Sequence, residues 1–233
     1  MALTSTPPST AGELSPKGPR GRYAKSEQVQ VRIVRAAAEV FGTIGFHAST
    51  FKEIARRAEV SERGLVYHFP TKEALLEAVM NDHHHRRSTV VLSATGLASF
   101  AAVLAVVEAD AQMASVVGLQ SILTGEATAH DHPAHEHYRL RYADLRTYLG
   151  RAFTAALNNG LVTSELDPTD LAAGLIALLD GLQMQWLYDH DGVRVGATID
   201  GYLAALLSPE AMAEVRGHRR AFLDESISDT AAQ

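Results

Sequence analysis

The sequence predicts an all-α fold in two parts, a small N-terminal unit of three helices and a larger helical body. Three observations predict it. Apolar residues recur every three or four positions through most of the chain, which is the spacing of one helix face. Polar capping residues and Gly or Pro breaks separate these periodic stretches. No stretch of the sequence alternates apolar and polar residues as a half-buried strand does.

The composition restricts the class of protein. The chain has 233 residues, 46% of them hydrophobic, which is enough for a small domain joined to a larger one. It has no cysteine, which excludes disulfides, thiolate metal sites and a cysteine nucleophile and fits a reducing cytoplasm. The N-terminus lacks the apolar core of a signal peptide, and the most apolar stretch, 97–107, meets Glu108 and Asp110 too soon to cross a bilayer. We therefore expect a soluble, cytoplasmic protein with no membrane partner.

Charge is distributed unevenly along the chain, whose net charge is −6. Residues 1–90 hold 13 Lys or Arg against 9 Asp or Glu, a net charge of +4. Residues 91–233 hold 8 against 18, a net charge of −10. Such a distribution lets one end approach phosphates while the other is repelled. It supports a nucleic-acid partner for the N-terminal part without establishing one, since ordinary variation in surface charge is the alternative.

Residues 1–24 have the composition of a disordered basic arm, rich in Pro, Ser and Thr and then basic from Lys17 onward. The Pro-Arg-Gly-Arg stretch that holds Arg20 and Arg22 resembles the core of AT-hook peptides, which lay two arginines in a narrow A·T-rich minor groove. This resemblance would make both arginines DNA contacts, on an arm placed just before the first helix. A solvated, charged tail is the alternative, and the sequence leaves both open.

Residues 25–72 form the small unit, and its first helix is predicted from Ser26 to Gly45. Six apolar residues mark its buried face at helical spacing: Val29, Ile33, Ala37, Val40, Phe41 and Ile44. A short helix follows at about 51–58. Thr50 and Glu53 have the spacing of a capping box in front of it, in which the Thr hydroxyl takes a backbone donor and the Glu side chain reaches back.

A second short helix is predicted at about 62–68. Ser61 is a natural N-cap for it, and Pro70 stops it. Thr71 then caps a long helix that continues beyond His85. The tight turn between the two short helices supplies a small residue, an apolar residue and a cap.

Two short capped helices joined by a tight turn, inside a three-helix unit, are the geometry of a helix-turn-helix. In this motif the first short helix braces the second, which enters the major groove of DNA with its N-terminal side chains facing base edges. Seven apolar residues can form the small core: Phe51, Ile54, Ala55, Ala58, Val60, Leu65 and Phe69. Seven polar residues are left for the outside: Lys52, Arg56, Arg57, Arg63, Tyr67, His68 and Lys72.

Three stretches of this unit carry a more specific signal: Phe41-Gly42-Thr43-Ile44-Gly45-Phe46, Thr50-Phe51-Lys52-Glu53-Ile54-Ala55, and Gly64 to Leu75 with Tyr67-His68-Phe69 followed closely by Lys72-Glu73. Together they resemble the DNA-binding domain of the tetracycline-repressor (TetR) family, over about residues 26–80. The resemblance implies an all-helical homodimer whose larger C-terminal domain binds an inducer and dimerises. Its DNA partner would be a pseudo-palindromic, double-stranded operator.

The resemblance also implies roles by position. It places seven residues at the DNA: Thr50, Tyr67, His68 and Lys72 at phosphates, and Ser61, Arg63 and Gly64 at or near base edges. A lysine at a helix start opposes the helix dipole, so a phosphate contact explains Lys72. Alternatively, Tyr67 and His68 complete the small core. Glu62 and Val66 depart from the family pattern, and Glu62 would repel phosphate unless it reads a cytosine amine or pairs with Arg63.

The resemblance implies that residues 73–225 form the ligand-binding and dimerisation domain, and we expect 226–233 to be a flexible tail. The clearest breaks within the domain are 158–160 and 167–168. Beyond the helix that begins at Thr71, we predict six further helices at roughly 98–112, 115–128, 134–158, 169–189, 195–207 and 209–225.

The helix at 169–189 is the candidate dimer interface. Its apolar face comprises Leu171, Leu175, Leu178, Leu182 and Trp186. Gly174 and Gly181 would let a partner helix approach, and with the helix at 195–207 they could form half of a four-helix interface. Residues 177–186 also resemble the dimerisation helix of the TetR subfamily found in choline/betaine-pathway repressors. The alternative is that this helix belongs to the core of a monomer.

A pocket for a small-molecule effector is plausible between residues 98 and 158. Its candidate lining residues are Phe100, Leu104, Met113, Gln120, Leu123, Tyr142 and Phe153. Ordinary helix packing is the alternative for most of them. We expect no cofactor and no metal: His83, His84 and His85 fan out on a helix, while His130, His132 and His135 lie in a polar connection.

The sequence thus predicts a sequence-specific DNA-binding transcriptional regulator, a repressor that a small molecule releases from its operator. Repression is implied by the family resemblance alone. One alternative is an architectural DNA-binding protein that needs no ligand. Another is a metal-dependent protein that uses the His-rich loop, although no nucleophile elbow, paired-carboxylate site or phosphate loop accompanies it in the sequence. We expect no enzymatic activity.

Overall fold

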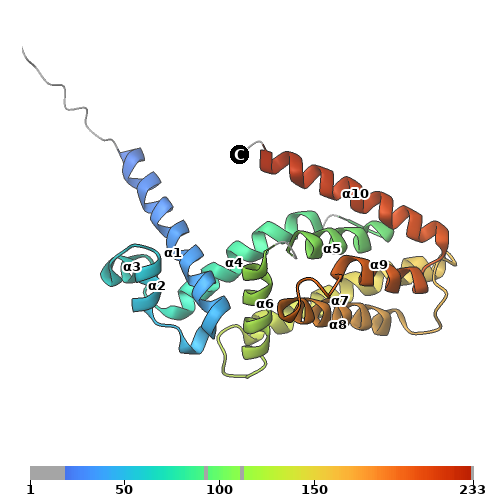
Figure 1. The fold of residues 1–233 in the computed structure, drawn as a ribbon, viewed down its shortest axis with the longest axis horizontal. Helices are drawn as coiled ribbons and strands as arrows, with labels where there is room; N and C mark the ends of the chain where they lie inside the picture. The colour runs from blue at the N-terminus through green and yellow to red at the C-terminus, as the bar shows by residue number, and fades with distance from the viewer. Residues whose placement is uncertain (1–18, 92–93, 111–112, 232–233) are drawn as a thin grey trace, which may run out of the picture.

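The computed structural model describes residues 19–91, 94–110 and 113–231. Within these ranges the chain folds into helices joined by short connections, and the all-α prediction is confirmed (Figure 1). The helices are α1 (Pro19–Ala48), α2 (Phe51–Arg57), α3 (Glu62–His68), α4 (Lys72–Val91), α5 (Leu97–Asp110), α6 (Ala114–Glu126), α7 (His135–Asn158), α8 (Pro168–Tyr188), α9 (Val195–Leu206) and α10 (Pro209–Ala231).

Helix α1 begins earlier than predicted, at Pro19 rather than near Ser26. Proline is favoured at the first helical position, because its missing N–H has no acceptor there and its φ is already helical. The backbone of Arg20 and Arg22 is therefore helical and not the extended arm of an AT-hook peptide. Residues 1–18, which hold the rest of the predicted arm, lie outside the described residues.

Helices α1, α2 and α3 and the start of α4 pack around one apolar cluster and form the head of the molecule (Figure 1). Three side chains with no exposed surface anchor the cluster: Phe41 from α1, Ile54 from α2 and Leu65 from α3. Leu75 and Leu76 of α4 are equally buried. The two short helices are held from behind by this cluster, so their outer faces stay free.

The core of the head continues into the body. Leu119 and Leu123 of α6 and Tyr138 of α7 belong to the same buried cluster as Ile33 and Phe41 of α1. Helices α1 and α6 touch at Gly42, where an added Cβ would lie 3.1 Å from the backbone nitrogen of Leu119. The predicted domain boundary near residue 72 therefore does not coincide with the limit of the head cluster, which includes residues of α6 and α7.

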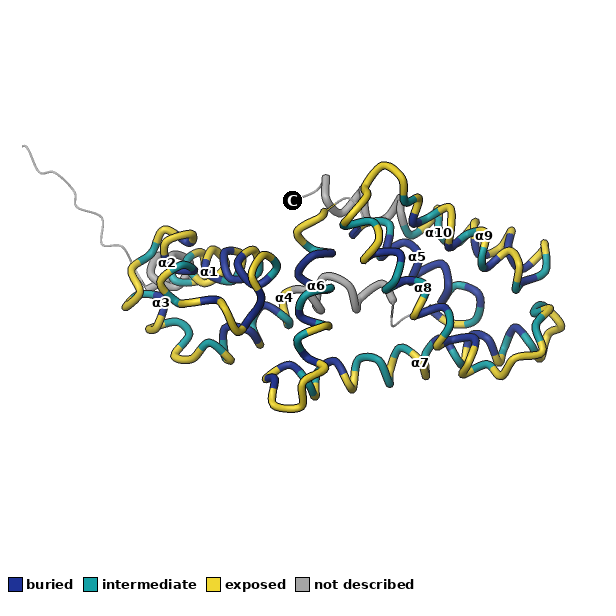
Figure 2. The backbone as a smooth tube through the Cα atoms, turned by 60° about the horizontal axis from the view of Figure 1, so that its bottom comes forward, coloured by how far each residue is buried: buried dark blue, intermediate teal, exposed yellow. Residues whose placement is uncertain are grey.

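The second apolar cluster is formed by α5, α7, α8, α9 and the first turns of α10 (Figure 2). Helix α5 lies inside it and is buried along almost its whole length, which fits its nearly continuous apolar sequence. The rings of Phe100 and Phe153 meet there with centroids 4.7 Å apart. On its outer side Arg219 of α10 forms an ion pair with Glu108 of α5. These contacts make the body one packed bundle.

Within the described ranges, no single helix combines the length and the apolar composition that a membrane span requires. Helices α5 and α6 meet that test only when taken together, and they are bent by 110° relative to each other.

Candidate nucleic-acid interface

Helix α2 is capped as the sequence predicts, but only in part. The Thr50 side chain accepts a hydrogen bond from the backbone N–H of Glu53 at 3.2 Å. The Glu53 carboxylate does not reach back to complete a capping box; it accepts two hydrogen bonds from Arg56, at 2.9 and 2.7 Å. A bidentate guanidinium pair competes successfully with a single backbone donor, because it supplies two charge-assisted hydrogen bonds.

The turn between α2 and α3 is a Schellman motif. The N–H of Val60 donates to the carbonyl of Ala55 at 3.0 Å, and the N–H of Glu59 donates to that of Arg56 at 3.3 Å. Glu59 has a φ of +55°, the left-handed conformation that this motif requires and that favours glycine. The motif reverses the chain within three residues and fixes the angle between α2 and α3.

Helix α3 presents one continuous outer face. Ser61 caps the helix by accepting a hydrogen bond from the N–H of Gly64 at 3.0 Å. Leu65 is fully buried and anchors the helix to the head. The residues on the opposite face are all exposed: Glu62, Arg63, Val66 and Tyr67. Residues at positions 62, 63, 66 and 67 of a helix lie on one side of it, because 3.6 residues complete a turn. The four side chains are therefore neighbours on one helical face.

Tyr67 and His68 occupy different environments. Tyr67 is 81% exposed, so it does not complete the small core, whereas His68 is half-buried. Their rings meet edge to face with centroids 5.2 Å apart, which orients the tyrosine. Val66 is 43% exposed beside Tyr67. Sequence reasoning noted Val66 only as a departure from the family pattern, yet its exposure places it among the candidate base contacts.

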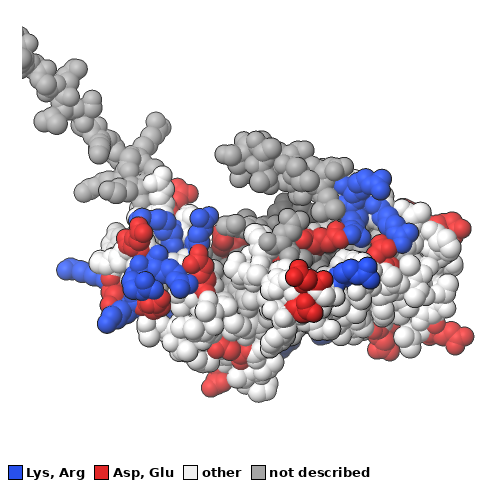
Figure 3. All heavy atoms as spheres, viewed as in Figure 1, with Lys and Arg blue, Asp and Glu red and all other residues white. Residues whose placement is uncertain are grey.

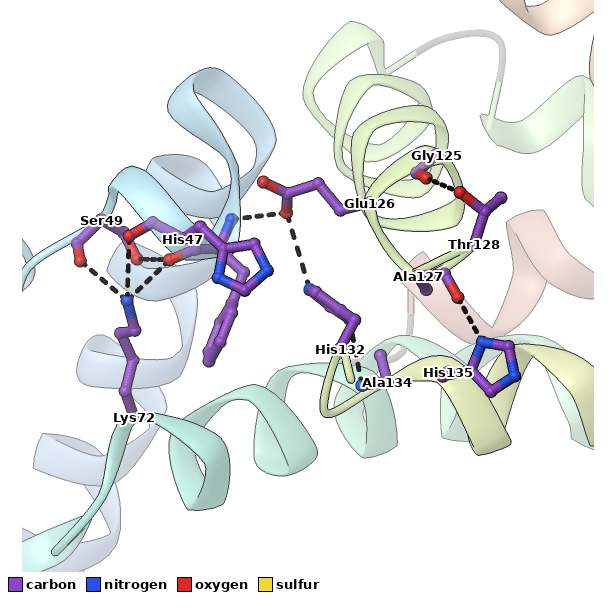
Figure 4. Close-up of polar contacts among 11 residues, drawn as sticks. His47, Ser49, Lys72, Gly125, Glu126, Ala127, Thr128, His132, Ala134 and His135 are labelled. Carbon is purple, nitrogen blue, oxygen red and sulfur yellow. Dashed lines mark hydrogen bonds and ion pairs between the residues drawn. The ribbon is translucent and has the colours of Figure 1, made fainter. Parts of the chain in front are cut away.

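Lys72 has a structural role that the sequence did not reveal. Its ammonium group donates hydrogen bonds to the carbonyl oxygens of Phe46, His47 and Ser49, at 2.8, 3.3 and 3.1 Å (Figure 4). It also lies 4.5 Å from the centroid of the Phe46 ring. All three ammonium protons have acceptors inside the protein, so a phosphate would have to compete with these carbonyls, and the phosphate contact of Lys72 stays a prediction. The lysine neutralises the carbonyl end of α1, where a cation is favourable.

Lys and Arg gather on the outside of the head in Figure 3, over α1, α2 and α3. Some of this charge is neutralised locally, since Arg56 pairs with Glu53 and Arg57 lies 3.6 Å from Glu39. Lys52 and Arg63 are exposed as well. Among the ion pairs of the described residues, none joins Glu62 to Arg63.

The predicted pocket residues do not gather around one site. Phe100, Leu104 and Phe153 are buried in the body cluster. Leu123 belongs to the head cluster. Tyr142 packs against both clusters, and its hydroxyl donates to Asp180 at 2.7 Å. Met113 is 49% exposed at the start of α6, and its place in a pocket stays a prediction.

Gln120 is buried, and its amide donates to Thr124 at 3.1 Å. Gln120 of α6, Tyr142 of α7 and Asp180 of α8 each contribute a polar group where these three helices pack together. Burial raises the pKa of Tyr142, and the hydrogen bond to the Asp180 carboxylate raises it further. The tyrosine therefore stays protonated and remains a donor.

The predicted dimer face of α8 is wrong in its orientation. Leu171, Leu175 and Leu182 are buried in the core of the same chain, while Leu178 and Trp186 are half-buried against it. The apolar stripe that the sequence displays is thus used for packing within the chain. Gly174 also serves an internal contact, since a Cβ there would lie 3.2 Å from the Tyr202 hydroxyl of α9.

The outer face of α8 carries different residues. Small and apolar side chains are exposed along it: Ala173, Ala177, Met184 and Tyr188. A Cβ added at Gly181 would meet nothing within 4 Å. The exposed face of α9 is also made of small residues: Ala197, Thr198, Gly201, Ala204 and Ala205.

Two histidines at the α6–α7 connection, His130 and His135, have hydrogen-bond partners within the protein. His135 Nδ1 lies 2.8 Å from the carbonyl oxygen of Ala127, to which it must donate (Figure 4). His135 Nε2 then accepts from His130 Nδ1 at 3.2 Å. No group of three or more His, Cys, Asp or Glu within the described part of the chain is placed to hold a metal ion.

The fold and the exposed face of α3 define a class: a helical protein with a helix-turn-helix head. The model for the bacterial regulatory proteins of the tetR family matches residues 33–79, and the model for the C-terminal domain of BetI-type transcriptional repressors matches residues 98–208. The chain belongs to the tetR family of bacterial regulatory proteins. The predicted resemblance is confirmed, including the subfamily of the C-terminal domain.

Curated relatives match over less than a third of this chain. The A-factor receptor protein of Streptomyces griseus is 39% identical over 61 residues, which are 26% of this chain and 22% of the receptor. The regulator RutR of Escherichia coli K12 is 38% identical over 71 residues, which are 30% of this chain and 32% of RutR. The matched part therefore spans less than a third of the length of these relatives.

Solved structures share the fold over 78% of this chain. A protein from Saccharomonospora viridis in complex with choline has a TM-score of 0.64 at 18% identity, over 78% of this chain and 99% of that one. The SmeT–triclosan complex has a TM-score of 0.63 at 17% identity, over 78% and 93%. SmeT is the repressor of a multidrug efflux pump of Stenotrophomonas maltophilia. At these identities the likeness establishes the fold alone.

Proposed function

We propose that this protein is a sequence-specific DNA-binding transcriptional regulator that acts in the cytoplasm as a homodimeric repressor. The observation that carries this proposal is the outer face of α3: a capped helix, fixed from behind by the buried Leu65, with four exposed side chains on its free side. That is the arrangement a recognition helix needs to enter a major groove. Membership of the tetR family supports the same function.

The proposed DNA contacts fall into two groups. Arg63, Val66 and the cap around Ser61 and Gly64 face base edges, where an exposed valine suits a thymine methyl group and an arginine suits guanine. Tyr67, His68 and Thr50 contact phosphates, which position the head on the duplex. A phosphate contact of Lys72 would have to compete with the carbonyls that its ammonium group binds.

The proposed dimer uses the outer faces of α8 and α9. Small exposed residues on both helices, with Gly181 and Gly201 open to close approach, would let two copies form a four-helix contact. Met184 and Tyr188, 45% and 87% exposed, would be covered by it. A two-fold dimer matches a pseudo-palindromic operator, whose half-sites lie about 34–36 Å apart along the duplex.

The proposed effector is a small molecule bound in the body. Proteins of the same fold have been solved with choline and with triclosan, and the polar groups of Gln120, Tyr142 and Asp180 lie in the corresponding domain. An effector lowers operator affinity only if it binds the DNA-incompetent conformation more tightly than the competent one. The chemical identity of the effector does not follow from these groups.

The test is a gel shift with the purified protein and its own upstream DNA across a salt series. We expect a discrete complex that resists competitor DNA, and Arg63→Ala and Tyr67→Ala each to weaken it at least about tenfold. Arg151→Ala, which removes an exposed arginine of α7, is the matched control and should bind like wild type. Binding that ignores sequence and collapses with salt would instead support an architectural role.

A further inference from the structure

Phe46, near the end of α1, is contacted from three other segments of the chain. Its carbonyl accepts a hydrogen bond from Lys72 of α4. Its backbone N–H donates to Oε2 of Glu126, the last residue of α6, at 2.7 Å. Its ring meets that of His132, in the α6–α7 connection, with centroids 5.3 Å apart. We call Phe46, Glu126 and His132 the joint, because they connect the head to the body.

The backbone at the joint requires this arrangement. Gly45 has a φ of 81°, which breaks the helical geometry of α1 just before Phe46. Glutamate at the end of a helix opposes the helix dipole, so the Glu126 carboxylate needs donors from elsewhere. It finds one in the N–H of Phe46, and a side chain at Gly45 would occupy the position of the carboxylate.

His132 closes the joint from the other side. Its side chain has no exposed surface, and its Nδ1 accepts from the N–H of Ala134 at 3.1 Å. The proton of the neutral ring therefore lies on Nε2, which faces Oε2 of Glu126 at 3.8 Å. The ring also packs edge to face against His47, with centroids 5.1 Å apart. The body thus holds Phe46 by its N–H and by its ring.

We propose that Glu126 and His132 are positioning residues that set the orientation of the DNA-binding head on the body. This inference rests on the proposed function, because it concerns two heads that read one operator. Apolar contact between α1 and α6 is non-directional and tolerates rotation of one helix on the other. The hydrogen bond from Phe46 to Glu126 is directional and removes that freedom.

The orientation passes from the joint to the recognition helix through short connections. Lys72 binds three carbonyls of residues 46–49, and Thr50, the cap of α2, comes directly after them. A change at Phe46 therefore moves α2 and α3 together with the end of α1. In a dimer such a movement changes the separation of the two recognition helices.

Operator spacing is the readout that separates positioning from stability. Inserting or removing one base pair between half-sites shifts them by about 3.4 Å and rotates them about the duplex axis. We would select the binding sequence from random DNA with wild-type protein. Affinities would then be measured for duplexes with the preferred spacing and with one base pair more or less. Thermal unfolding of each variant would be recorded in parallel.

Wild-type protein should prefer one spacing by at least about tenfold. Glu126→Ala removes the acceptor of the Phe46 N–H. We expect this variant to bind the preferred spacing about tenfold more weakly and the altered spacings with nearly unchanged affinity. The ratio of affinities between the preferred and the altered spacings should therefore fall. Glu126→Asp keeps the charge but has a shorter side chain, and it should lower the same affinity ratio. It replaces the alanine variant if that variant fails to fold. Glu126→Gln keeps an acceptor oxygen and should prefer the same spacing as wild type does. Glu136→Ala, which removes an exposed carboxylate of α7, is the control.

The outcomes separate the inference from the proposed function. If wild-type protein binds no duplex of any spacing, the proposed function fails and this inference fails with it. If wild-type protein binds with a clear spacing preference and the Ala and Asp variants keep the same preference, the joint does not orient the head. An equal loss of affinity at every spacing would likewise overturn the inference, since it would indicate a purely structural role.

Discussion

At the residue scale, the head depends on a few side chains whose partners lie outside their own helix. Lys72 is the clearest case: it begins α4, yet its ammonium group binds the carbonyls that end α1. Glu126 ends α6 and binds the N–H of Phe46 in α1. In both cases the charge opposes the dipole of its own helix, and the partner in α1 explains why it is there.

Glu59 is the residue whose replacement should stabilise the protein. It adopts a φ of +55° in the turn between α2 and α3, a conformation that is strained for any residue with a Cβ. Glu59→Gly should raise the free energy of unfolding by about 0.5–1 kcal/mol, the relief of strain less the extra entropy of the unfolded chain. Denaturant unfolding measures it, and Glu59→Ala, which keeps the Cβ, is the control. Equal stabilities of the Gly and Ala variants would contradict the strain argument.

His132 should make the stability of the protein fall in mild acid. Burial lowers its pKa below the ordinary value near 6.5; the carboxylates of Glu126 and Asp131 raise it and the neighbouring His47 lowers it. Because the unfolded state then binds the proton more readily, the stabilising contribution of His132 is complete above about pH 6.5. It declines as the pH falls below that value and levels off below the pKa of the folded state.

The measurement is denaturant unfolding from pH 8 to pH 5 for wild type and His132→Gln. Ten other histidines are present, so only the difference between the two proteins isolates this residue. We expect the difference to shrink as the pH falls. A constant difference across the range would show that His132 does not titrate differently in the folded and unfolded states.

At the scale of elements, the close contact between α1 and α6 brings the head and the body together. Gly42 permits this contact, because a Cβ there would lie 3.1–3.2 Å from the backbone and Cβ of Leu119. Gly118 lies opposite, and a Cβ at that position would be 3.5 Å from the carbonyl of Gly42. Helices approach so closely only where side chains are missing.

Gly42→Ala should therefore destabilise the protein although alanine favours a helix. Overpacking costs about 1–3 kcal/mol and the gain in helix propensity is about 1 kcal/mol, so we expect a net loss of roughly 1 kcal/mol. Gly125→Ala on α6 is the matched control, since a Cβ there meets nothing within 4 Å, and it should be neutral or stabilising. Denaturant midpoints compare the two. A Gly42→Ala variant as stable as Gly125→Ala would disprove the close contact.

At the scale of the whole molecule, the body has a buried face for each of its helices and an outer face on α8 and α9 that is made of small and apolar residues. The same surface is proposed to join two copies, and the two heads then share one operator. Affinity and oligomeric state should be linked, because a single head makes only half of the contacts.

Ala177→Glu should convert the dimer to a monomer and reduce operator binding at least about a hundredfold, because it would bury one carboxylate from each copy in the proposed interface. Ala129→Glu, which adds the same charge to the exposed α6–α7 connection, should stay dimeric. Light scattering after size-exclusion chromatography gives the mass, and a gel shift gives the affinity. A dimeric Ala177→Glu variant with full affinity would place the interface elsewhere.

The sequence by itself determined the class of fold, the helix-turn-helix and its two caps. Helical periodicity, the side chains of Thr50 and Ser61, and the breaks at Gly and Pro are local properties, and local hydrogen bonds and propensities fix them. The tertiary structure decided which side of a helix faces which partner. From the sequence alone, the leucine stripe of α8 fits a buried core face and a dimer interface equally well. Only its packing against α5, α7 and α9 assigned it to the core.

Tertiary structure also decided the partners of Lys72 and Glu126. Lys72 lies 26 residues from Phe46 in sequence, and Glu126 lies 80 residues from it, so no local pattern joins them. A charged side chain at the unfavourable end of a helix was the only trace of either contact in the sequence, and it suggested a phosphate for Lys72. The reason is physical: hydrogen-bond partners depend on distance in space, whereas sequence patterns report only on neighbours along the chain.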